Sequence, residues 1–462
     1  MQSKAHLCPK CGENTIYFDG ICHSCRQKQR REEILNLGAG EVEAMILKIA
    51  DRIDEIEKWD EICNDFWALF SLLDIHDPRI ARAAAAKQIY YPPEIYFGAP
   101  KDVRDSLIAK LDSLQDNSKN ALNHLLRSLA WQGDEKTTEL FYELYKNPRP
   151  WRKKLYVGTD FYAKIGGWSF DKRGERKSLV FDKCLAAVRV KDGADKNGER
   201  ERGDESASEI SNFKGRAGSA NSEQNAQNGA EKTLNLHAGA QSAHASIDED
   251  AILRNEHANF KSDAQKDASG GLNLSENAKD ACCKGANQNA DDPVQIGRPT
   301  GQKCEFCGCE MLDILRLKAD EPRLTFLNLK HDAIFRCCPT CVGSVMYFCK
   351  CGADGELQMH CEGEGMEKSC FSQHDMTRLS GMKFKLGSEV SPFYGYFDEL
   401  DVTVGGYPQW VQDAAYLSCP SCGGTMKHLA QIPFGELVQG EGVIYVQICE
   451  KCEILGGCFQ YT

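Results

Sequence analysis

Residues 419–432, CPSCGGTMKHLAQI, repeat the frame of an earlier stretch, residues 304–317, CEFCGCEMLDILRL. Both read C-x-x-C-G-x-x-M, followed by aliphatic residues three positions apart. Each copy is followed by a further cysteine group, CCPTC after the earlier one and CEKC after the later one. The apolar, β-branched segments in between read as strands, so each copy has the pattern of two cysteine pairs joined by a β-hairpin.

Cysteine is the outlier of the composition, with 23 among 462 residues. The beginning of the chain, MQSKAHLCPK, has no apolar export signal, and no run of about 18 apolar residues indicates a membrane span. We therefore expect a cytoplasmic protein, in a compartment where disulfides rarely persist. Thiols grouped as C-x-x-C pairs are what one tetrahedral ion requires, so the sequence predicts metal binding.

We predict three zinc sites per chain, each held by four thiolates. The proposed ligands are Cys8, Cys11, Cys22 and Cys25; then Cys304, Cys307, Cys338 and Cys341; then Cys419, Cys422, Cys449 and Cys452. Cys337 competes with Cys338, and we choose Cys338 because it keeps the two-residue gap before Cys341. A glycine follows the first pair of every set, where a tight turn needs a conformation that other residues rarely adopt.

Other interpretations of these cysteines stay open. The first is that the cysteines are reduced and buried without a metal, and the second is that the N-terminal set binds iron. The third is a redox dithiol, which is normally one isolated pair that opens a helix in a βαβ unit. A further thiol group raises the question of a fourth ion, and its irregular spacing leaves that question open. This group comprises Cys349, Cys351, Cys361 and Cys370, with His360 and His374 nearby.

The chain divides into five regions, which together predict an α+β multidomain protein. They are a zinc ribbon (1–35), helical repeats (41–150), a β-rich connector (151–190), a disordered low-complexity insert (191–300) and a β-rich region with duplicated zinc ribbons (301–462). Asp77 before Pro78 is a helix start signal, and an apolar stripe follows, formed by Val103, Leu107, Ile108, Leu111 and Leu114. The insert lacks the apolar residues that would offset its ordering entropy.

Two resemblances add to this reading. The segments DPRIARAAAA and GDEKTTELFYEL, within residues 60–147, resemble HEAT-like repeats of the phycobilisome-lyase-like kind, which implies a scaffold or a protein-binding surface.

The C-terminal region resembles the YwqG-like family, whose G-G-x-P-x-W-x-Q signature corresponds here to Gly405, Gly406, Pro408, Trp410 and Gln412. That resemblance implies a β-rich fold bearing a zinc ribbon. We expect Trp410 and Gln412 to pack and to satisfy a loop.

Three functions are compatible with the sequence. We favour a non-enzymatic adaptor that binds another protein, because each set of four cysteines leaves no coordination position for chemistry. The second is nucleic-acid binding through Arg26, Lys28, Arg30 and Arg31 beside the first set, although the net charge of -12 argues against a general affinity for phosphate backbones. The third is a hydrolase or transferase, which needs convergent polar groups and a perturbed titratable residue.

Overall fold

The computed structural model describes most of the chain outside residues 191–291. The described residues are 6–12, 15–16, 20–114, 119–155, 157–190, 292–352, 355–365, 379–397, 402–437 and 441–461. Chain contacts place the described residues up to Arg189 and from residue 292 onward in one compact unit, so the helical and β-rich regions belong together. The predicted insert, with Cys282 and Cys283, lies outside the described residues up to residue 291.

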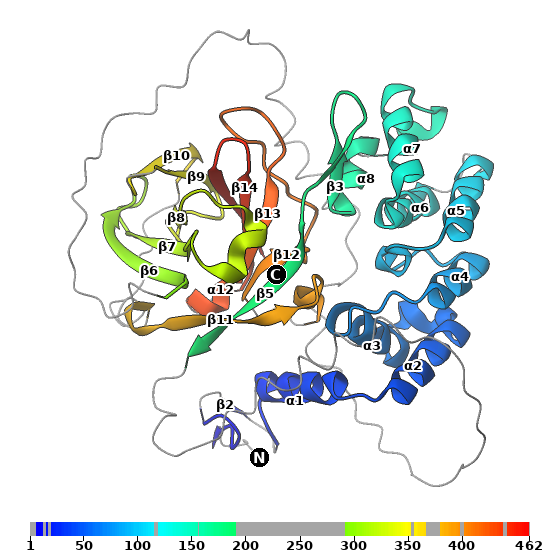
Figure 1. Ribbon diagram of the computed structural model, residues 1–462, viewed down its shortest axis with the longest axis horizontal. Coiled ribbons are helices and arrows are strands. Elements are labelled where there is room, and N and C mark those ends of the chain that lie inside the picture. The colour runs from blue at the N-terminus through cyan, green and yellow to red at the C-terminus, as the bar shows by residue number, and fades with distance from the viewer. Residues whose placement is uncertain are drawn as a thin grey trace, which may run out of the picture. The chain divides into compact units, whose positions relative to one another are not determined.

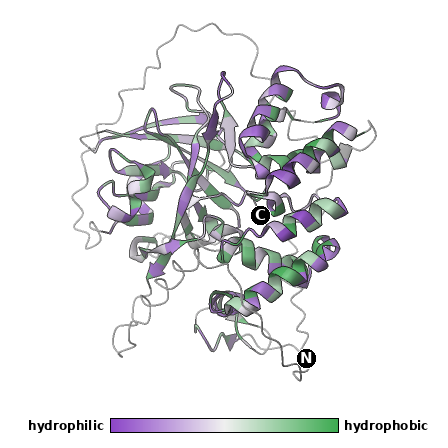
Figure 2. Ribbon diagram, turned by 45° about the vertical axis from the view of Figure 1, so that its right-hand side comes forward, coloured by the Kyte–Doolittle hydropathy of each residue, from purple (hydrophilic) through white to green (hydrophobic). Residues whose placement is uncertain are grey.

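The first part of this unit is helical, and its main helices follow one another in chain order (Figure 1). They are α1 His23–Leu35, α2 Ala39–Asp51, α3 Glu61–Trp67, α4 Pro78–Lys87, α5 Lys101–Ser113, α6 Lys119–Gln132, α7 Glu135–Lys146 and α8 Thr159–Ile165, with short turns η1 Ile53–Lys58, η2 Ala68–Leu72, η3 Pro93–Tyr96 and η4 Pro150–Lys154. The predicted start at Asp77 is confirmed, since its carboxylate accepts the Arg79 N–H at 2.8 Å. Hydrophobic residues alternate with hydrophilic ones along the helices (Figure 2). Of the predicted stripe, Val103, Leu107 and Leu111 are buried, and the other two residues are partly buried against the same core.

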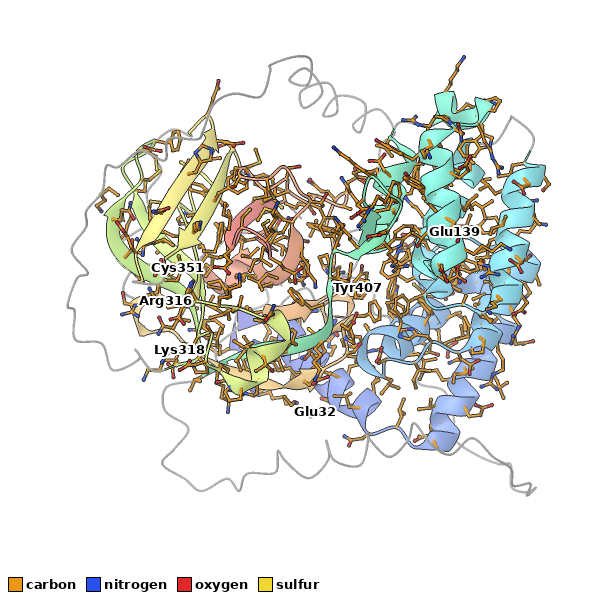
Figure 3. All side chains as sticks on the ribbon, turned by 45° about the horizontal axis from the view of Figure 1, so that its top comes forward. Glu32, Glu139, Arg316, Lys318, Cys351 and Tyr407 are labelled. Carbon is orange, nitrogen blue, oxygen red and sulfur yellow. The ribbon has the colours of Figure 1, made fainter. Side chains whose placement is uncertain are left out.

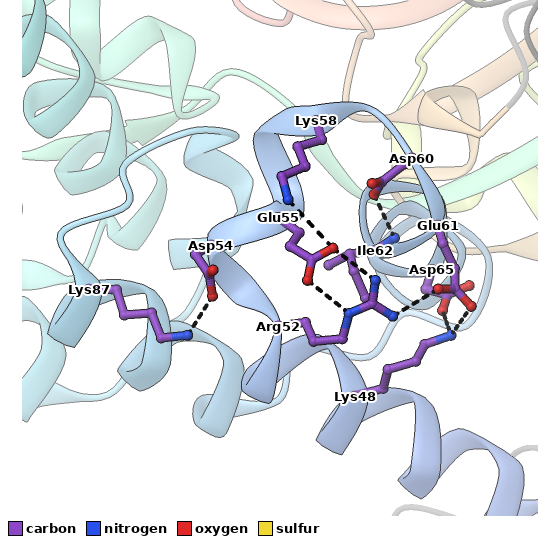
Figure 4. A network of polar contacts seen from close by, with 10 residues as sticks. All are labelled: Lys48, Arg52, Asp54, Glu55, Lys58, Asp60, Glu61, Ile62, Asp65 and Lys87. Carbon is purple, nitrogen blue, oxygen red and sulfur yellow. Dashed lines mark hydrogen bonds and ion pairs between the residues drawn. The ribbon is translucent and has the colours of Figure 1, made fainter.

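Ion pairs bind consecutive helices to one another on their polar side (Figure 4). The Arg52 guanidinium, at the end of α2, donates to Glu55 at 2.8 Å and to Glu61 at 2.9 Å. Lys87 at the end of α4 pairs with Asp54 of η1 at 2.6 Å. These side chains are largely exposed, so the pairs add little stability individually and mainly fix the register of one helix on the next.

Among the described residues, the largest sheet has eight strands in the order β10-β9-β15-β14-β13-β12-β5-β11. Their bounds are β5 Phe181–Val190, β9 Val345–Cys351, β10 Leu357–Gly363, β11 Lys383–Val390, β12 Val402–Gly406, β13 Lys427–Pro433, β14 Val443–Cys449 and β15 Ile454–Gln460. From β10 to β5 the neighbours are antiparallel. Residues of β12, β13 and β14 are almost all buried, so the sheet is covered on both faces at its centre.

A second sheet, in the described part of the chain, joins β6 Val294–Lys303, β7 Glu310–Leu317 and β8 Ala333–Cys337. Strand β6 begins inside the range 191–300 that the sequence assigns to the insert, so that boundary falls too late. Val294 and Ile296 are buried against the core, and the alternation of these two apolar residues is too short to stand out among polar neighbours. The antiparallel pairing of β7 with β8 and of β13 with β14 confirms the hairpins predicted between the cysteine pairs.

The region 151–190 does not form a separate connector. It contains α8, a small hairpin of β3 Trp168–Phe170 with β4 Arg176–Ser178, and β5. Strand β5 pairs with β12, with Val404 opposite Leu185, and is therefore an interior strand of the large sheet. The helical region thus leads directly into the β-rich region.

Aromatic side chains fill the boundary between the helices and the sheet. The ring centroid of Phe393 lies 4.3 Å from that of Phe70 and 4.8 Å from that of Phe97. Tyr407 stacks on Trp131 of α6 with centroids 5.7 Å apart, and Figure 3 shows Tyr407 where the helical and β elements meet. This cluster explains why the two regions form one unit.

None of the helices in the described ranges combines the length and the apolar character that crossing a membrane demands.

Candidate metal centres

The C-terminal set is built from two tight turns that face each other. The Gly423 N–H donates to the Cys419 carbonyl at 2.8 Å, and Gly423 adopts a φ of 68°. The other turn follows β14, where the Glu453 N–H donates to the Cys449 carbonyl at 2.8 Å. The turns bring the Cys422 and Cys449 sulfurs to 3.7 Å.

The middle set repeats the first of these turns. The Gly308 N–H donates to the Cys304 carbonyl at 2.8 Å, with a φ of 71° at Gly308. The partner cysteines lie between β8 and β9, in a helical turn where the Val342 N–H donates to the Cys338 carbonyl at 3.0 Å. The sulfurs of Cys307 and Cys338 are 3.5 Å apart, and all four cysteines of this set are buried.

The N-terminal set combines a hairpin with a helix start. Strands β1 His6–Leu7 and β2 Thr15–Ile16 pair on either side of the first turn, where Gly12 has a φ of 70°. The second pair opens α1, with Cys22 in the N-cap position, and the Cys22 N–H donates to the Cys8 sulfur at 3.2 Å. The Cys11 and Cys22 sulfurs are 3.7 Å apart.

The spacing of the sulfurs identifies what each set can hold. Disulfide sulfurs lie about 2.05 Å apart, whereas four sulfurs at about 2.3 Å from a tetrahedral zinc ion lie about 3.8 Å from one another. The separations of 3.5 to 4.0 Å in the structure match the second case. In the described part of the chain, three sets of four cysteine sulfurs lie within 4.8 Å of one another, which is consistent with about three zinc ions per chain.

The electrostatics of the sets also favour a cation. Burial raises the pKa of Cys8, but hydrogen bonds from the backbone at Cys22, Cys11 and Lys10 outweigh it and lower the pKa to about 6. Burial and the neighbouring thiols raise the pKa of Cys25 to about 12. The set thus stabilises the thiolate of one cysteine and disfavours ionisation of another. The four thiols can therefore ionise together only when a divalent cation offsets the repulsion between their thiolates.

The structure separates Cys337 from Cys338. The sulfur of Cys338 lies with those of Cys304, Cys307 and Cys341. Cys337, at the end of β8, is fully buried among the core residues of the sheets, and burial raises the pKa of its thiol far above the usual range. The two adjacent cysteines therefore point to different surroundings, as alternation along an extended chain requires.

The residues of the suggested fourth site are not gathered in the described part of the chain. Cys349 and Cys351 lie on β9 and Cys361 on β10, and no cluster of potential ligands includes them among the described residues. The Cys349 thiol instead exchanges hydrogen bonds with the backbone of Arg336 on β8. Cys370 and His374 lie outside the described residues.

The three sets differ in accessibility, which predicts an order of reaction. Cys422 is exposed, whereas Cys338 is fully buried. Under a limiting amount of a thiol-alkylating reagent, we expect Cys422 to be modified well before Cys338, with zinc released in step. Peptide mass spectrometry together with a colorimetric zinc indicator measures both. Equal rates of modification at the two cysteines would contradict the accessibility seen in the structure.

The G-G-x-P-x-W-x-Q signature needs its two glycines because other backbone atoms lie very close to them. Gly405 and Gly406 have φ values of 79° and 71° at a bulge in β12. A Cβ atom on Gly406 would lie 2.5 Å from the Pro392 carbonyl oxygen, and one on Gly405 would lie 2.2 Å from the Lys183 carbonyl oxygen. No side chain fits at either position without moving the main chain.

Buried polar side chains anchor the loop that follows these glycines. The bonds are from the Gln409 N–H to Gln431 (3.0 Å), the Val411 N–H to Tyr445 (3.0 Å), the Gln412 N–H to Gln460 (3.0 Å) and the Leu417 N–H to Gln447 (2.8 Å). Trp410 packs on the ring of Tyr445, with centroids 4.5 Å apart. Met311 and Met426, the methionines of the repeated frame, are both buried. The packing role expected for Trp410 is thus confirmed. The exposed Gln412 side chain donates from Nε2 to the Tyr461 carbonyl at 3.4 Å, in agreement with the loop-satisfying role expected for it.

The basic residues after the first set are only partly free for a ligand. Arg26 and Lys28 are exposed on α1. The Arg31 guanidinium instead lies over the ring of Tyr394, 4.7 Å from its centroid, and so packs α1 against the remainder of the unit. Half of the predicted basic patch is therefore placed where a phosphate could reach it, on a helix that also carries Glu32 and Glu33.

One carboxyl group with a shifted pKa belongs to none of the sequence motifs. Burial raises the pKa of Glu94 in η3 to about 7, against the opposing effects of its own backbone N–H and of Arg127. No spacing rule points to it, because its neighbours come from α6 and from the β-rich region. Such a group is the kind of perturbed residue that marks candidate functional sites.

The raised pKa of Glu94 makes the folded state less stable as the pH rises. Between pH 4.5, its ordinary pKa, and about 7, the folded chain holds a proton that the unfolded chain has lost, so stability falls as pH rises. We expect Glu94→Gln to raise the free energy of unfolding by about 1 kcal/mol at pH 8 and to leave it unchanged at pH 4. Urea unfolding at both pH values measures this, with exposed Glu139→Gln as the control. A gain of equal size at pH 4 would refute the titration.

Comparison with known proteins gives one distant relative and no family. A Salmonella typhimurium (strain LT2) protein named "Uncharacterized protein YpfL" is 20% identical to this chain over 376 residues. The match covers 80% of this chain and 65% of that protein, so the chain spans less than two thirds of the relative's length. No protein-family model matches the chain. No solved structure matches it either.

Proposed function

We propose that this chain is a non-enzymatic adaptor in which three structural zinc ions hold the modules that bind another protein. The observation that carries the proposal is the composition of the three sets, each with four sulfurs in ligand spacing. Structural zinc sites use four protein ligands, whereas catalytic zinc keeps one position for water or substrate. The twelve cysteines named above would be the ligands, and each ion would fix a hairpin or a helix start.

The helical region is the proposed binding surface. Helix α2 packs on α3 and α4, and α4, α5, α6 and α7 then pack each on the next. The resemblance of residues 60–147 to HEAT-like repeats supports a stacked, extended surface. Its exposed positions are rich in charge: Arg82 of α4 pairs with Asp102 at 2.7 Å, and Lys136 of α7 pairs with Asp105 at 2.9 Å. The resemblance of the C-terminal region to the YwqG-like family supports two duplicated zinc-ribbon modules beside this surface.

An affinity capture with charge-reversed variants tests the adaptor. We expect Arg82→Glu combined with Lys136→Glu to lose a partner that the unaltered chain captures, because both side chains are about half exposed on the helical surface. The matched control, Arg173→Glu with Lys183→Glu, changes the charge equally outside α2–α7 and should keep the partner. A chain lacking residues 191–291 should keep it too. Equal capture by both double variants, or no specific partner at all, would refute the proposal.

The exposure of Arg26 and Lys28 beside the first set supports a second candidate, nucleic-acid binding. Binding through two or three phosphate contacts would be weak and would decrease steeply with salt. Fluorescence anisotropy with single-stranded and duplex oligonucleotides at low and moderate salt measures it. The full chain with Arg26→Gln and Lys28→Gln should then lose the affinity, and absence of binding by the unaltered chain at low salt removes this candidate.

A further inference from the structure

One face of α6 carries polar atoms that are buried without a hydrogen-bond partner. They are Nδ1 of His124, Nε of Arg127 and Nε1 of Trp131. Their spacing of three and four residues places them one above the other on the helix. A fourth such atom, Oε1 of Gln409, lies on the loop after β12. Buried polar groups almost always have partners, so four of them in neighbouring segments require an explanation.

Two contacts show that this face of α6 is turned towards that loop. The Arg127 Nη2 atom lies 4.0 Å from Oδ1 of Asp413, and the Trp131 ring stacks on Tyr407. The loop between these residues is held firmly, because its backbone N–H groups are bonded to buried side chains of β13, β14 and β15. The α6 face therefore lies against a loop of fixed conformation.

The charge around these atoms limits what can bind. Arg127 is a permanent cation that keeps about a third of its side chain exposed, so a ligand can reach it from solvent. Asp413 is close to it, and the Glu94 carboxyl is near enough for Arg127 to act on its ionisation. Asp413 already offsets the charge of Arg127, and Glu94, with a pKa of about 7, adds negative charge only as the pH rises past neutrality, so a singly charged anion is favoured over a doubly charged one.

We propose that the α6 face and the loop after β12 bind a small monocarboxylate, held by the Nε–H of Arg127 and the indole N–H of Trp131. These two atoms can only donate, and they match the acceptor oxygens of a carboxylate. His124 donates from Nδ1 in one of its tautomers, and the Gln409 amide donates when it is turned by 180°. The carboxylate would thus provide acceptors for the Arg127 and Trp131 donors, with His124 and Gln409 beside them. This inference does not depend on the adaptor role or on zinc.

The indole N–H resonance of Trp131 gives a direct test. In ¹⁵N–¹H spectra of the full chain, the resonance missing in Trp131→Phe identifies it. We expect it to shift saturably with sodium acetate, L-lactate or N-acetylglycine, and not with sodium chloride at matched ionic strength. Arg127→Gln should weaken the response about tenfold or more, because it removes a charge-assisted bond. The matched control, Arg82→Gln on α4, should respond like the unaltered chain.

The alternatives have distinct outcomes. A resonance that responds to none of the carboxylates means that water alone fills the site, and it overturns the proposal. A response to inorganic phosphate but not to the carboxylates overturns the assignment of ligand class. An equal response in Arg127→Gln and in Arg82→Gln overturns the assigned residues. Trp131→Phe removes part of a buried aromatic side chain together with its N–H donor, so this variant serves only to assign the resonance.

Discussion

Replacing Cys338 by serine is expected to lower the zinc content by about one ion per chain and to unfold the region around β8 and β9. The Cys338 sulfur lies in the fully buried set, and its carbonyl accepts the N–H groups that form the turn between these strands. A structural zinc ion contributes about 10 to 16 kcal/mol of apparent binding energy, against a typical domain stability of about 5 to 15 kcal/mol. Losing the site therefore outweighs what the remaining contacts supply.

The neighbouring residue provides the matched control. Cys337→Ala removes a thiol that is equally buried but lies outside the set, so it leaves a small cavity and costs about 1 kcal/mol. Elemental analysis should give the same zinc content for Cys337→Ala as for the unaltered chain, and hydrogen exchange should show β8 and β9 still protected. If Cys338→Ser keeps its full zinc content while Cys337→Ala loses an ion, the ligand assignment is reversed.

Gly406→Ala is expected to lower the free energy of unfolding by about 2 to 5 kcal/mol. The left-handed conformation of this residue costs a non-glycine residue about 1 to 2 kcal/mol, and the added Cβ would meet the Pro392 carbonyl oxygen and the Cys184 side chain at 2.5 to 3.0 Å. Displacing closely packed atoms adds about 1 to 3 kcal/mol. The bulge of β12 is what positions the loop over the α6 face, so the damage should extend to that loop.

Gly301→Ala is the control that separates backbone strain from the steric clash expected at Gly406. Gly301 has a nearly identical φ of 77°, yet a Cβ there would meet no atom within 4 Å. Its substitution should cost about 1 to 2 kcal/mol from backbone strain alone. Urea unfolding of both variants gives the difference, and equal losses would show that the close approach at Gly406 is unimportant.

The sequence predicts those features that depend on local spacing. A C-x-x-C pair followed by glycine makes its turn within five residues, so the tight turns at Gly12, Gly308 and Gly423 could be predicted. The same holds for the capped start at Asp77 and for the choice of Cys338 over Cys337, which follows from one gap length.

Features that depend on distant segments could not be predicted in this way. Strand β9 pairs with β15, about a hundred residues later, and β5 lies between β12 and β11, so apolar periodicity alone gives no order of strands. The unpartnered atoms of α6 look, in the sequence, like ordinary polar residues of an amphipathic helix. Only the packing of the loop near Asp413 shows that they face inward.

The zinc content of the purified full chain tests the central claim most directly. Elemental analysis after exhaustive dialysis against a metal-free buffer, with protein quantified by amino-acid analysis, should give about three zinc ions per chain, one for each set of four sulfurs. A folded chain that carries no zinc, or that carries stoichiometric iron in its place, would contradict the account.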